Sequence, residues 1–395
     1  MPQILKKYSL LLLALALTLV VIGTSAFWLT NKPKPMRKPA QDPAPLVETI
    51  SLELTEHPIT ITAFGNVMAA QSVNLNARVD GMVIDVTDNF IDGGLLKQGE
   101  KIVQLDPVDY ELRVRERQSD LAKAEFDLKL EQGQQAIARQ EFELLGQNLD
   151  DQARELVLRR PHLRSAKARV DAARAALEQA RLNLERTQPF APFNAIILQR
   201  NANVGSWVST FSTGTPLVKL AGTDYFWIDV SVPMNQVRWL TIPGINTDQP
   251  RGSKVKVRYE QAWRDGQFRQ GYVKRLKAEV EPSGRMAKLI VQVDDPLALE
   301  PNHQGQPVLT LGTLVKVELT GQTLTKVYRL PESALHDGRY LWLLANDSTL
   351  DIRAIEPVWT ENGMLFITHN DLPQNARVIT SRLAAPVQGM TLRVQ

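Results

Sequence analysis

A heptad repeat over residues 163–187 constrains the fold of this chain more than any other feature. Large apolar residues recur every seven positions, and a small residue follows each of them three positions later. The large set is Leu163, Val170, Leu177 and Leu184, and the small set is Ala166, Ala173, Ala180 and Thr187. This a/d pattern predicts a helix whose apolar seam packs lengthwise against a second helix.

The preceding segment, from about Tyr110 to Gly146, is expected to be that second helix. One set of its seam positions holds Leu121, Leu128, Phe142 and Leu149, and the other holds Ala124, Ala138 and Leu145. This seam is less regular because Glu131 and Gln135 interrupt it. Two such arms, joined near residues 146–151, predict an antiparallel hairpin about 50 Å long at about 1.5 Å per residue.

Local signals mark where the second arm begins and where it is interrupted. Asp150 or Asp151 is a suitable N-cap, since a short carboxylate side chain accepts hydrogen bonds from the first amides of a helix. Pro161 removes a backbone donor, so we expect a break or kink near Arg160. A pair of amphipathic helices packed on a domain is the alternative, but four regular heptads with small d residues favour a projecting hairpin.

On both sides of the hairpin the sequence predicts short strands. Residues 73–86 place Gly81 between two apolar runs, and residues 92–94 form a second turn. After Gln188 the same order returns, with apolar runs on either side of Gly205. Short strands separated by glycine turns are typical of a small sandwich or barrel, so a helical hairpin interrupts a β domain.

The N-terminal region predicts a membrane anchor followed by a spacer. Residues 9–29 form an uncharged apolar run that is long enough to cross about 30 Å of hydrocarbon. Trp28 stands at its end, where interfacial aromatic residues are found. A cleaved signal peptide with a processing site at residues 24–26 is the alternative, but apolar residues continue beyond that site. Five prolines within residues 33–45 predict an extended spacer.

Charge and composition argue against nucleic-acid binding. Residues 1–40 carry six basic residues and no acidic one, whereas the rest of the chain carries 40 basic and 43 acidic residues. A nucleic-acid-binding protein would keep its basic excess on the folded part. The chain has no cysteine, which suits an oxidising compartment. Large domains are translocated regardless of flanking charge, so we expect the body outside the cytoplasm.

No residue pattern predicts catalysis, a cofactor or a bound metal. The five histidines are His57, His162, His303, His336 and His369, and no two of them have metal-ligand spacing on one element. Asp294 and Asp295 precede a proline, which predicts a turn in place of a catalytic acid pair. The sequence also has no glycine-rich phosphate loop ending in Lys-Ser or Lys-Thr.

Four segments in a fixed order carry a resemblance to a known family. They are AxVDGMVIDV…GxxLKQGEKIVQLD before the hairpin, ARLNLERT at its end, APFNAII…VGSWV…GTPLVKL after it, and then WIDVSVP. In this order they resemble the periplasmic adaptors, or membrane fusion proteins, of RND-type tripartite efflux pumps, within the HlyD-like secretion family. Two residues depart from the family pattern. Ala195 stands where glycine is usual, and Leu311, in the later segment 309–319, stands before Gly312 where proline is usual. The resemblance covers about residues 46–395.

The resemblance implies a multidomain, mainly β chain with an inserted α-helical coiled-coil hairpin. It implies a barrel-sandwich hybrid, or lipoyl-like, domain, a β-barrel domain, a membrane-proximal β domain and an N-terminal transmembrane helix. A lipoyl or biotin carrier is excluded, because the hairpin replaces the tight turn that would hold the modified lysine. The expected divisions are residues 1–31 for the tail and anchor, 32–45 for the linker, 46–64 for the first strands of the membrane-proximal and barrel domains, 65–109 and 188–222 for the lipoyl-like halves, 110–187 for the hairpin, 223–322 for the β-barrel and 323–395 for the membrane-proximal domain.

The resemblance also implies a partner contact at the hairpin tip. The family pattern there is Arg, then Leu four positions later, then Ser seven further, whereas Glu143 follows Arg139 by four here and Asp150 replaces the serine. The candidate contact residues are Arg139, Leu144, Leu145, Gly146, Gln147, Asn148, Asp150 and Asp151.

The function implied by the resemblance is that of a non-enzymatic adaptor for small-molecule export. It would be anchored in the inner membrane of a Gram-negative-type envelope, form a homo-oligomeric ring, and link an RND transporter to an outer-membrane channel. Two alternatives stay open. One is an adaptor of an ATP-driven exporter or secretion system, and the other is an envelope protein with a structural or interaction role and no part in transport.

Overall fold

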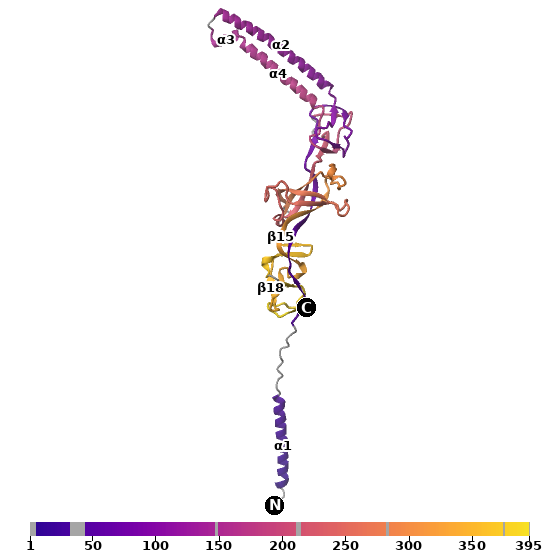
Figure 1. Cartoon of the computed structure of the whole chain (residues 1–395), viewed down its shortest axis with the longest axis vertical. Coiled ribbons are helices and arrows are strands. Elements are labelled where there is room, and N and C mark those ends of the chain that lie inside the picture. The colour runs from indigo at the N-terminus through magenta and orange to yellow at the C-terminus, as the bar shows by residue number, and fades with distance from the viewer. Residues whose placement is uncertain are drawn as a thin grey trace. The chain divides into compact units, whose positions relative to one another are not determined.

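The computed structural model describes residues 5–31, 44–146, 149–210, 215–281, 284–373 and 376–394 (Figure 1). Most of the expected proline-rich linker lies outside these residues. The chain divides into two compact units, one of Met1–Glu56 with Thr325–Gln395 and the other of His57–Leu324. The division falls within two long strands, β3 (Leu54–Ala69) and β15 (Leu314–Pro331), so each strand contributes to both units.

Helix α1 (Leu5–Thr30) contains the apolar run near the N-terminus. Residues 9–30 are long and apolar enough to cross a membrane, with a mean hydropathy of 2.5, and none of this window is buried within the protein. The hydroxyls of Thr18, Thr24 and Thr30 donate to backbone carbonyls one turn earlier, at 2.8–3.3 Å. The helix therefore satisfies these polar groups internally, as a hydrocarbon environment requires.

The β region around the hairpin contains two small sheets, with strand orders β4-β10-β8-β6 and β7-β5-β9. The bounds are β4 Ser72–Leu75, β5 Gly81–Val86, β6 Leu95–Leu96, β7 Val103–Leu105, β8 Ala195–Arg200, β9 Trp207–Val208 and β10 Val218–Gly222. Both sheets combine strands from before and after the hairpin. They share one core, which includes Val83, Leu105, Ile197 and Leu220. The hairpin is therefore an insertion in a single lipoyl-like β domain.

The next strands close into a barrel within the unit His57–Leu324. β12 (Lys254–Arg258) pairs with β13 (Arg269–Glu281), and the order continues through β14 (Met286–Asp294), β11 (Tyr225–Pro233) and β3 to β15, which pairs again with β12. Side chains along β11 alternate between buried and half-buried, as expected for a strand with one face in a barrel interior. The connections contain α5 (Met234–Val237) and the short 3₁₀ helix η1 (Pro301–His303).

The other unit combines both ends of the sequence. Its bounds are β1 Leu46–Val47, β2 Thr49–Ser51, η2 Glu332–Ala334, β16 Leu335–His336, β17 Tyr340–Leu344, β18 Leu350–Ala354, β19 Trp359–Glu361, β20 Met364–Thr368, η3 His369–Asp371, β21 Arg377–Ile379 and β22 Arg393–Val394. β1 pairs with β22 in parallel, and β2 pairs with β21 in antiparallel orientation. The main core of this unit includes Leu330, Leu341, Ile367 and Val378.

Candidate functional site

The hairpin consists of α2 (Val108–Leu145), α3 (Asp151–Val157) and α4 (Arg160–Glu185), and Figure 1 shows α2 and α4 side by side. The predicted seam of the second arm is confirmed, because its buried helical residues are Ala166, Val170, Leu177 and Ala180. The facing residues Leu121, Leu128 and Phe142 of α2 are half-buried. The prediction that Leu145 joins this seam is wrong. Its side chain is 68% exposed, because α2 ends there and α3 begins only after the turn.

The predicted break in the second arm is also confirmed. α3 ends at Val157, and α4 begins at Arg160 with Pro161 in its first turn. Between them Arg159 adopts a left-handed conformation with φ of 53°. A non-glycine residue in this region costs roughly 1–2 kcal/mol, so other contacts must hold it there.

Arg159 is held by a polar cluster that sequence analysis missed. Its Nε and Nη2 donate to the two carboxylate oxygens of Glu131 on α2 at 2.7 and 2.8 Å, and Nη2 also donates to Gln134 Oε1 at 2.6 Å. The hydrogen bonds from Arg159 hold the pKa of Glu131 below its usual value. The residue that interrupts the apolar seam of α2 therefore joins the two arms where the second arm breaks.

The hairpin tip has defined ends. Gly146 terminates α2 in a left-handed conformation with φ of 53°, which glycine adopts without a Cβ penalty. Asp150 caps α3 as predicted, since its carboxylate accepts from the Ala153 amide at 2.7 Å. Asp151 lies in the first turn of α3 and pairs with Arg154 at 3.4 Å. Both acids therefore order the start of the second arm.

Other candidate residues at the tip are more exposed. Leu144 is 80% exposed and precedes Leu145 at the end of α2. Arg139 lies more than one turn earlier, where it pairs with Glu143 at 3.1 Å, so this glutamate takes part in an intrahelical ion pair. Gln147 and Asn148, also predicted as contact residues, lie outside the described residues. The tip thus presents two exposed leucines in the last turn of α2, next to the Gly146 that ends this helix.

The root of the hairpin is fixed to the lipoyl-like domain by hydrogen bonds. Tyr110 in the first turn of α2 donates its hydroxyl to the Asp80 carbonyl at 2.7 Å. The Asp80 carboxylate accepts from the amide and hydroxyl of Thr210, which lower the pKa of Asp80. The Leu105 amide donates to the Thr187 carbonyl at 2.8 Å, so the chain enters and leaves the hairpin at adjacent points.

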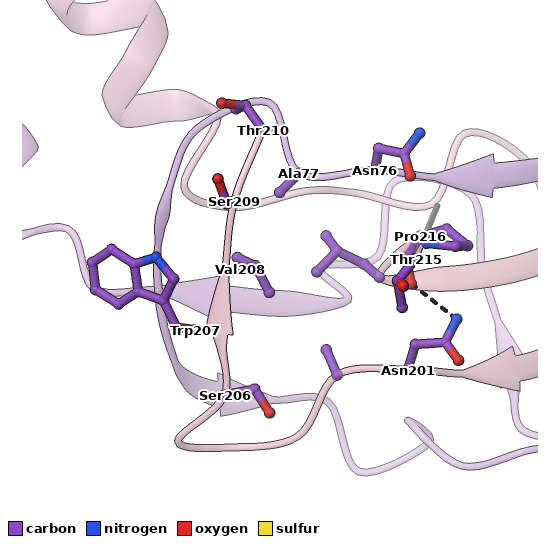
Figure 2. Close-up of a pocket in the computed structure, with 12 residues that line it drawn as sticks. Asn76, Ala77, Asn201, Ser206, Trp207, Val208, Ser209, Thr210, Thr215 and Pro216 are labelled. Carbon is purple, nitrogen blue, oxygen red and sulfur yellow. Dashed lines mark hydrogen bonds between the residues drawn. The ribbon is translucent and has the colours of Figure 1, made fainter. Parts of the chain in front are cut away.

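A cavity of about 390 Å³ lies in the lipoyl-like domain (Figure 2). Its described lining residues carry amide, hydroxyl and apolar side chains and no charged group. Asn201 donates to the Pro216 carbonyl at 3.0 Å, whereas Trp207 is 70% exposed and points away from these two residues. This lining offers hydrogen bonds but no acid and base pair for catalysis.

A second polar cluster, also missed by sequence analysis, lies at the end of β14. The Asp295 carboxylate accepts from the amides of Leu299 and Glu300 at 2.8 and 3.0 Å and lies 2.8 Å from His303 Nδ1. Burial alone would raise the pKa of Asp295, but the hydrogen bonds from the Glu300 and Leu299 amides, together with the hydrogen bond and charge interaction with His303, outweigh burial and lower the pKa.

Side-chain ligand atoms of Asp295, Glu300 and His303 lie within 4.8 Å of one another. Both oxygens of Asp295 accept the contacts above, and these contacts order the loop. Arg269, which is buried, supports the same loop by donating to the carbonyls of Asp294, Asp295 and Pro307. The sequence signal for this cluster was limited to a turn-forming aspartate before a proline.

No family model matches the chain. The chain is 22% identical over 366 residues to "Multidrug resistance protein MdtA" of Proteus mirabilis, covering 89% of this chain and 81% of that protein. It is 23% identical over 351 residues to the protein of the same name from Yersinia pseudotuberculosis, covering 86% and 73%. These relatives therefore match the chain across most of its length.

Two solved structures share the fold. MacA from Actinobacillus actinomycetemcomitans superimposes with a TM-score of 0.56 at 14% identity, covering 85% of this chain and 99% of that one. A MacA–MexA chimeric protein containing the Pseudomonas aeruginosa MexA α-hairpin domain gives 0.55 at 15% identity, covering 88% and 100%. The shared fold, the hairpin inserted in a lipoyl-like domain and the sequence relatives therefore agree, and together they support a membrane fusion protein of an efflux system.

Proposed function

We propose that this adaptor links an inner-membrane transporter of the RND type to an outer-membrane channel, so that small molecules are exported across the envelope. α1 anchors the chain by a single pass, and the body lies in the periplasm. The apolar window of α1 and the relatives named for multidrug resistance support this proposal. The unit of Met1–Glu56 and Thr325–Gln395 serves as the membrane-proximal domain, and copies assemble into a ring.

The observation that carries the proposal is the exposed apolar tip of the hairpin. Leu144 and Leu145 end α2 without packing into the seam, although leucine burial is favourable. A pair of exposed leucines at the end of a rigid rod suits an end-on contact with another protein. The proposed channel contact comprises these leucines with Arg139, Gly146, Gln147, Asn148, Asp150 and Asp151.

The proposed mechanism is mechanical, with no catalytic step assigned to this chain. The membrane-proximal and barrel domains contact the transporter, and the hairpins contact the channel. The ring of adaptors then encloses a duct between the two membranes. Substrate choice belongs to the transporter.

In-cell cross-linking of the tagged full-length protein, followed by affinity capture and mass spectrometry, tests the proposal. A matched variant replaces residues 108–185 with a short Gly-Ser linker, which the adjacent positions of Leu105 and Thr187 permit. We expect the full chain to recover an RND transporter and an outer-membrane channel, and the variant to recover the transporter alone.

Other outcomes select the alternatives. Recovery of an ATP-driven exporter in place of the RND transporter assigns the chain to that class of pump or secretion system. Recovery of neither transporter nor channel overturns the transport function and leaves a structural role in the envelope.

A further inference from the structure

A cavity of about 540 Å³ lies between the lipoyl-like domain and the barrel, within the unit His57–Leu324. Residues of β6 and the turn after it form one wall, namely Leu95, Leu96, Lys97 and Glu100. Residues of the loop from β14 to η1 form the other, namely Asp295, Leu299, Glu300 and Pro301. We call this cavity the β6–η1 cleft. Its volume falls within the roughly 300–1,000 Å³ that is usual for small-molecule sites.

Hydrogen bonds between the walls fix the shape of the cleft. The Asn194 side chain accepts from the Gln98 amide at 3.0 Å and donates to the Asp224 carboxylate at 2.9 Å. The Asp295 amide donates to the Asp224 carbonyl at 2.8 Å. These contacts connect the turn after β6 with the loop after β14. The cleft is therefore preformed, and a ligand would not have to order its walls.

The charge of the cleft is negative. Its described lining contains four carboxylates and one ammonium group, which gives a formal charge of −3. The ammonium group belongs to Lys97, and the carboxylates belong to Glu100, Asp224, Asp295 and Glu300. Such a cleft favours a cationic ligand over an anionic one.

Several of these carboxylates accept hydrogen bonds from uncharged donors. Glu100 accepts from the Lys97 amide at 2.9 Å and from the Thr87 hydroxyl at 3.2 Å. Asp224 accepts from the Asn194 side-chain amide. These contacts orient the carboxylates and leave their negative charge in place. The charge of the Glu300 side chain, which is 66% exposed, is open to solvent.

Apolar side chains occupy both walls of the same cleft. Leu95 is 39% exposed on the β6 wall, and Leu299 is 47% exposed on the η1 wall. A ligand with an apolar body would remove both leucines from water, which is favourable. A hydrated metal ion would leave them exposed. The combination of apolar walls and acidic groups therefore matches an organic cation better than an inorganic one.

We infer that the β6–η1 cleft binds a small organic cation with an apolar body. The body lies between Leu95 and Leu299, and the positive charge lies beside Glu300 and Glu100. The site belongs to this chain alone, so the inference does not depend on the proposed link between a transporter and a channel. It gives the adaptor a ligand site of its own at the joint between two of its domains.

A pair of probes with matched shape and opposite charge tests the inference. Tetraphenylphosphonium is an apolar cation, and tetraphenylborate is its anionic counterpart. Equilibrium dialysis with the full-length protein in nonionic detergent measures binding of each, with protein-free micelles as the blank. We expect tetraphenylphosphonium to bind at least about tenfold more tightly than tetraphenylborate, and its affinity to fall as salt is added.

Charge variants locate the bound cation. E300Q removes a lining carboxylate whose side chain holds no loop amide, and it should weaken binding of tetraphenylphosphonium about 3- to 5-fold. K97Q removes the ammonium group of the described lining and should strengthen binding by about the same factor. D248N makes the same charge change as E300Q at an exposed loop position outside the cleft and should leave binding unchanged.

The apolar part of the site has its own variant. L299A shortens an exposed side chain of the η1 wall and should weaken binding of tetraphenylphosphonium about 3-fold or more. L130A makes the same change on α2, far from the cleft in the sequence, and should have no effect.

Three results would overturn the inference. The first is equal binding of the two probes above the micelle blank. The second is an equal effect of E300Q and D248N, or of L299A and L130A, which would place the cation elsewhere. The third is displacement of tetraphenylphosphonium by Zn²⁺ or Mn²⁺, with metal binding that is lost in H303A and kept in L299A, which would assign the carboxylates to an inorganic cation.

Discussion

Glu131 and Arg159 are 28 residues apart in the sequence, and their side chains form a bidentate ion pair at 2.7 and 2.8 Å between the two arms of the hairpin. The glutamate interrupts an apolar seam, and the arginine occupies a left-handed position between two helices. The residue that interrupts the seam therefore pairs with the residue in the left-handed conformation. This ion pair fixes how the two arms are aligned along the hairpin.

The Glu131–Arg159 pair predicts a pH-dependent hairpin stability. Because Arg159 lowers the pKa of Glu131 below 4.5, the contribution is fully present well above that pH and is lost as the pH falls through the lowered folded-state pKa. E131Q should lower the melting temperature of the hairpin helices near neutral pH, and this effect should shrink as the pH falls below 4.5. Thermal melts over a pH series, followed by far-UV circular dichroism, measure this, with E125Q on the exposed side of α2 as control. An effect of E131Q that does not shrink as the pH falls would contradict the prediction.

The seam predicts which leucines stabilise the hairpin. L177A removes a buried side chain between the arms and should lower the free energy of unfolding by about 2–4 kcal/mol. L130A removes an exposed leucine of α2 and should change it by less than about 0.5 kcal/mol. Chemical denaturation followed by helical signal compares the two, and similar losses would show that the arms do not pack through this seam.

The cap at the tip predicts local order in α3. D150A removes the acceptor for the Ala153 amide and should destabilise the start of α3 by about 1 kcal/mol, whereas D150N keeps an acceptor and should change it little. Hydrogen exchange over residues 151–157 is the measurement. Unchanged protection in D150A would mean that the cap does not hold this helix.

The apolar helix α1 predicts retention in the membrane. If it is an uncleaved anchor, the mature protein keeps residues 1–26 in its intact mass and stays with membranes after an alkaline wash. Replacing residues 1–31 with a cleavable signal sequence should release the body in soluble form. A mature N-terminus immediately after Ala26 would instead establish the signal peptide.

The loop anchored by Asp295 predicts a stability effect without a ligand. D295A leaves the amides of Leu299 and Glu300 without their acceptor and should cost roughly 1–3 kcal/mol. D248A, at an exposed loop position, should cost less than about 0.5 kcal/mol. Denaturation followed by tryptophan fluorescence measures both. An equal, small effect would mean that these hydrogen bonds do not hold the loop.

Patterns among residues that are close together in the sequence predicted the hairpin well. The heptads located its two arms, Pro161 located the break, and the cap was narrowed to Asp150 or Asp151, of which Asp150 is the one observed. Each of these features depends on residues within about two turns, for which helix geometry is strongly constrained. Leu145 was placed wrongly because a heptad pattern shows which face a residue would occupy but not where its partner helix stops.

Features that depend on long-range contacts were not predicted. Glu131 appeared only as a break in a pattern, since nothing nearby in sequence indicates that Arg159 faces it. Nothing in the sequence indicates that His303 contacts Asp295, because this contact depends on how the intervening loop folds.

The hydrogen bond between Leu105 and Thr187 has a consequence for how such proteins diversify. Because the chain enters and leaves the hairpin there, equal numbers of heptads can be added to or removed from the two arms while the β domain keeps its geometry. Each added heptad pair would lengthen the rod by about 10 Å. Insertions and deletions of whole heptads can therefore change the length of the hairpin, and so the distance it spans in the periplasm, in discrete steps. The lipoyl-like β domain at the root need not change with it.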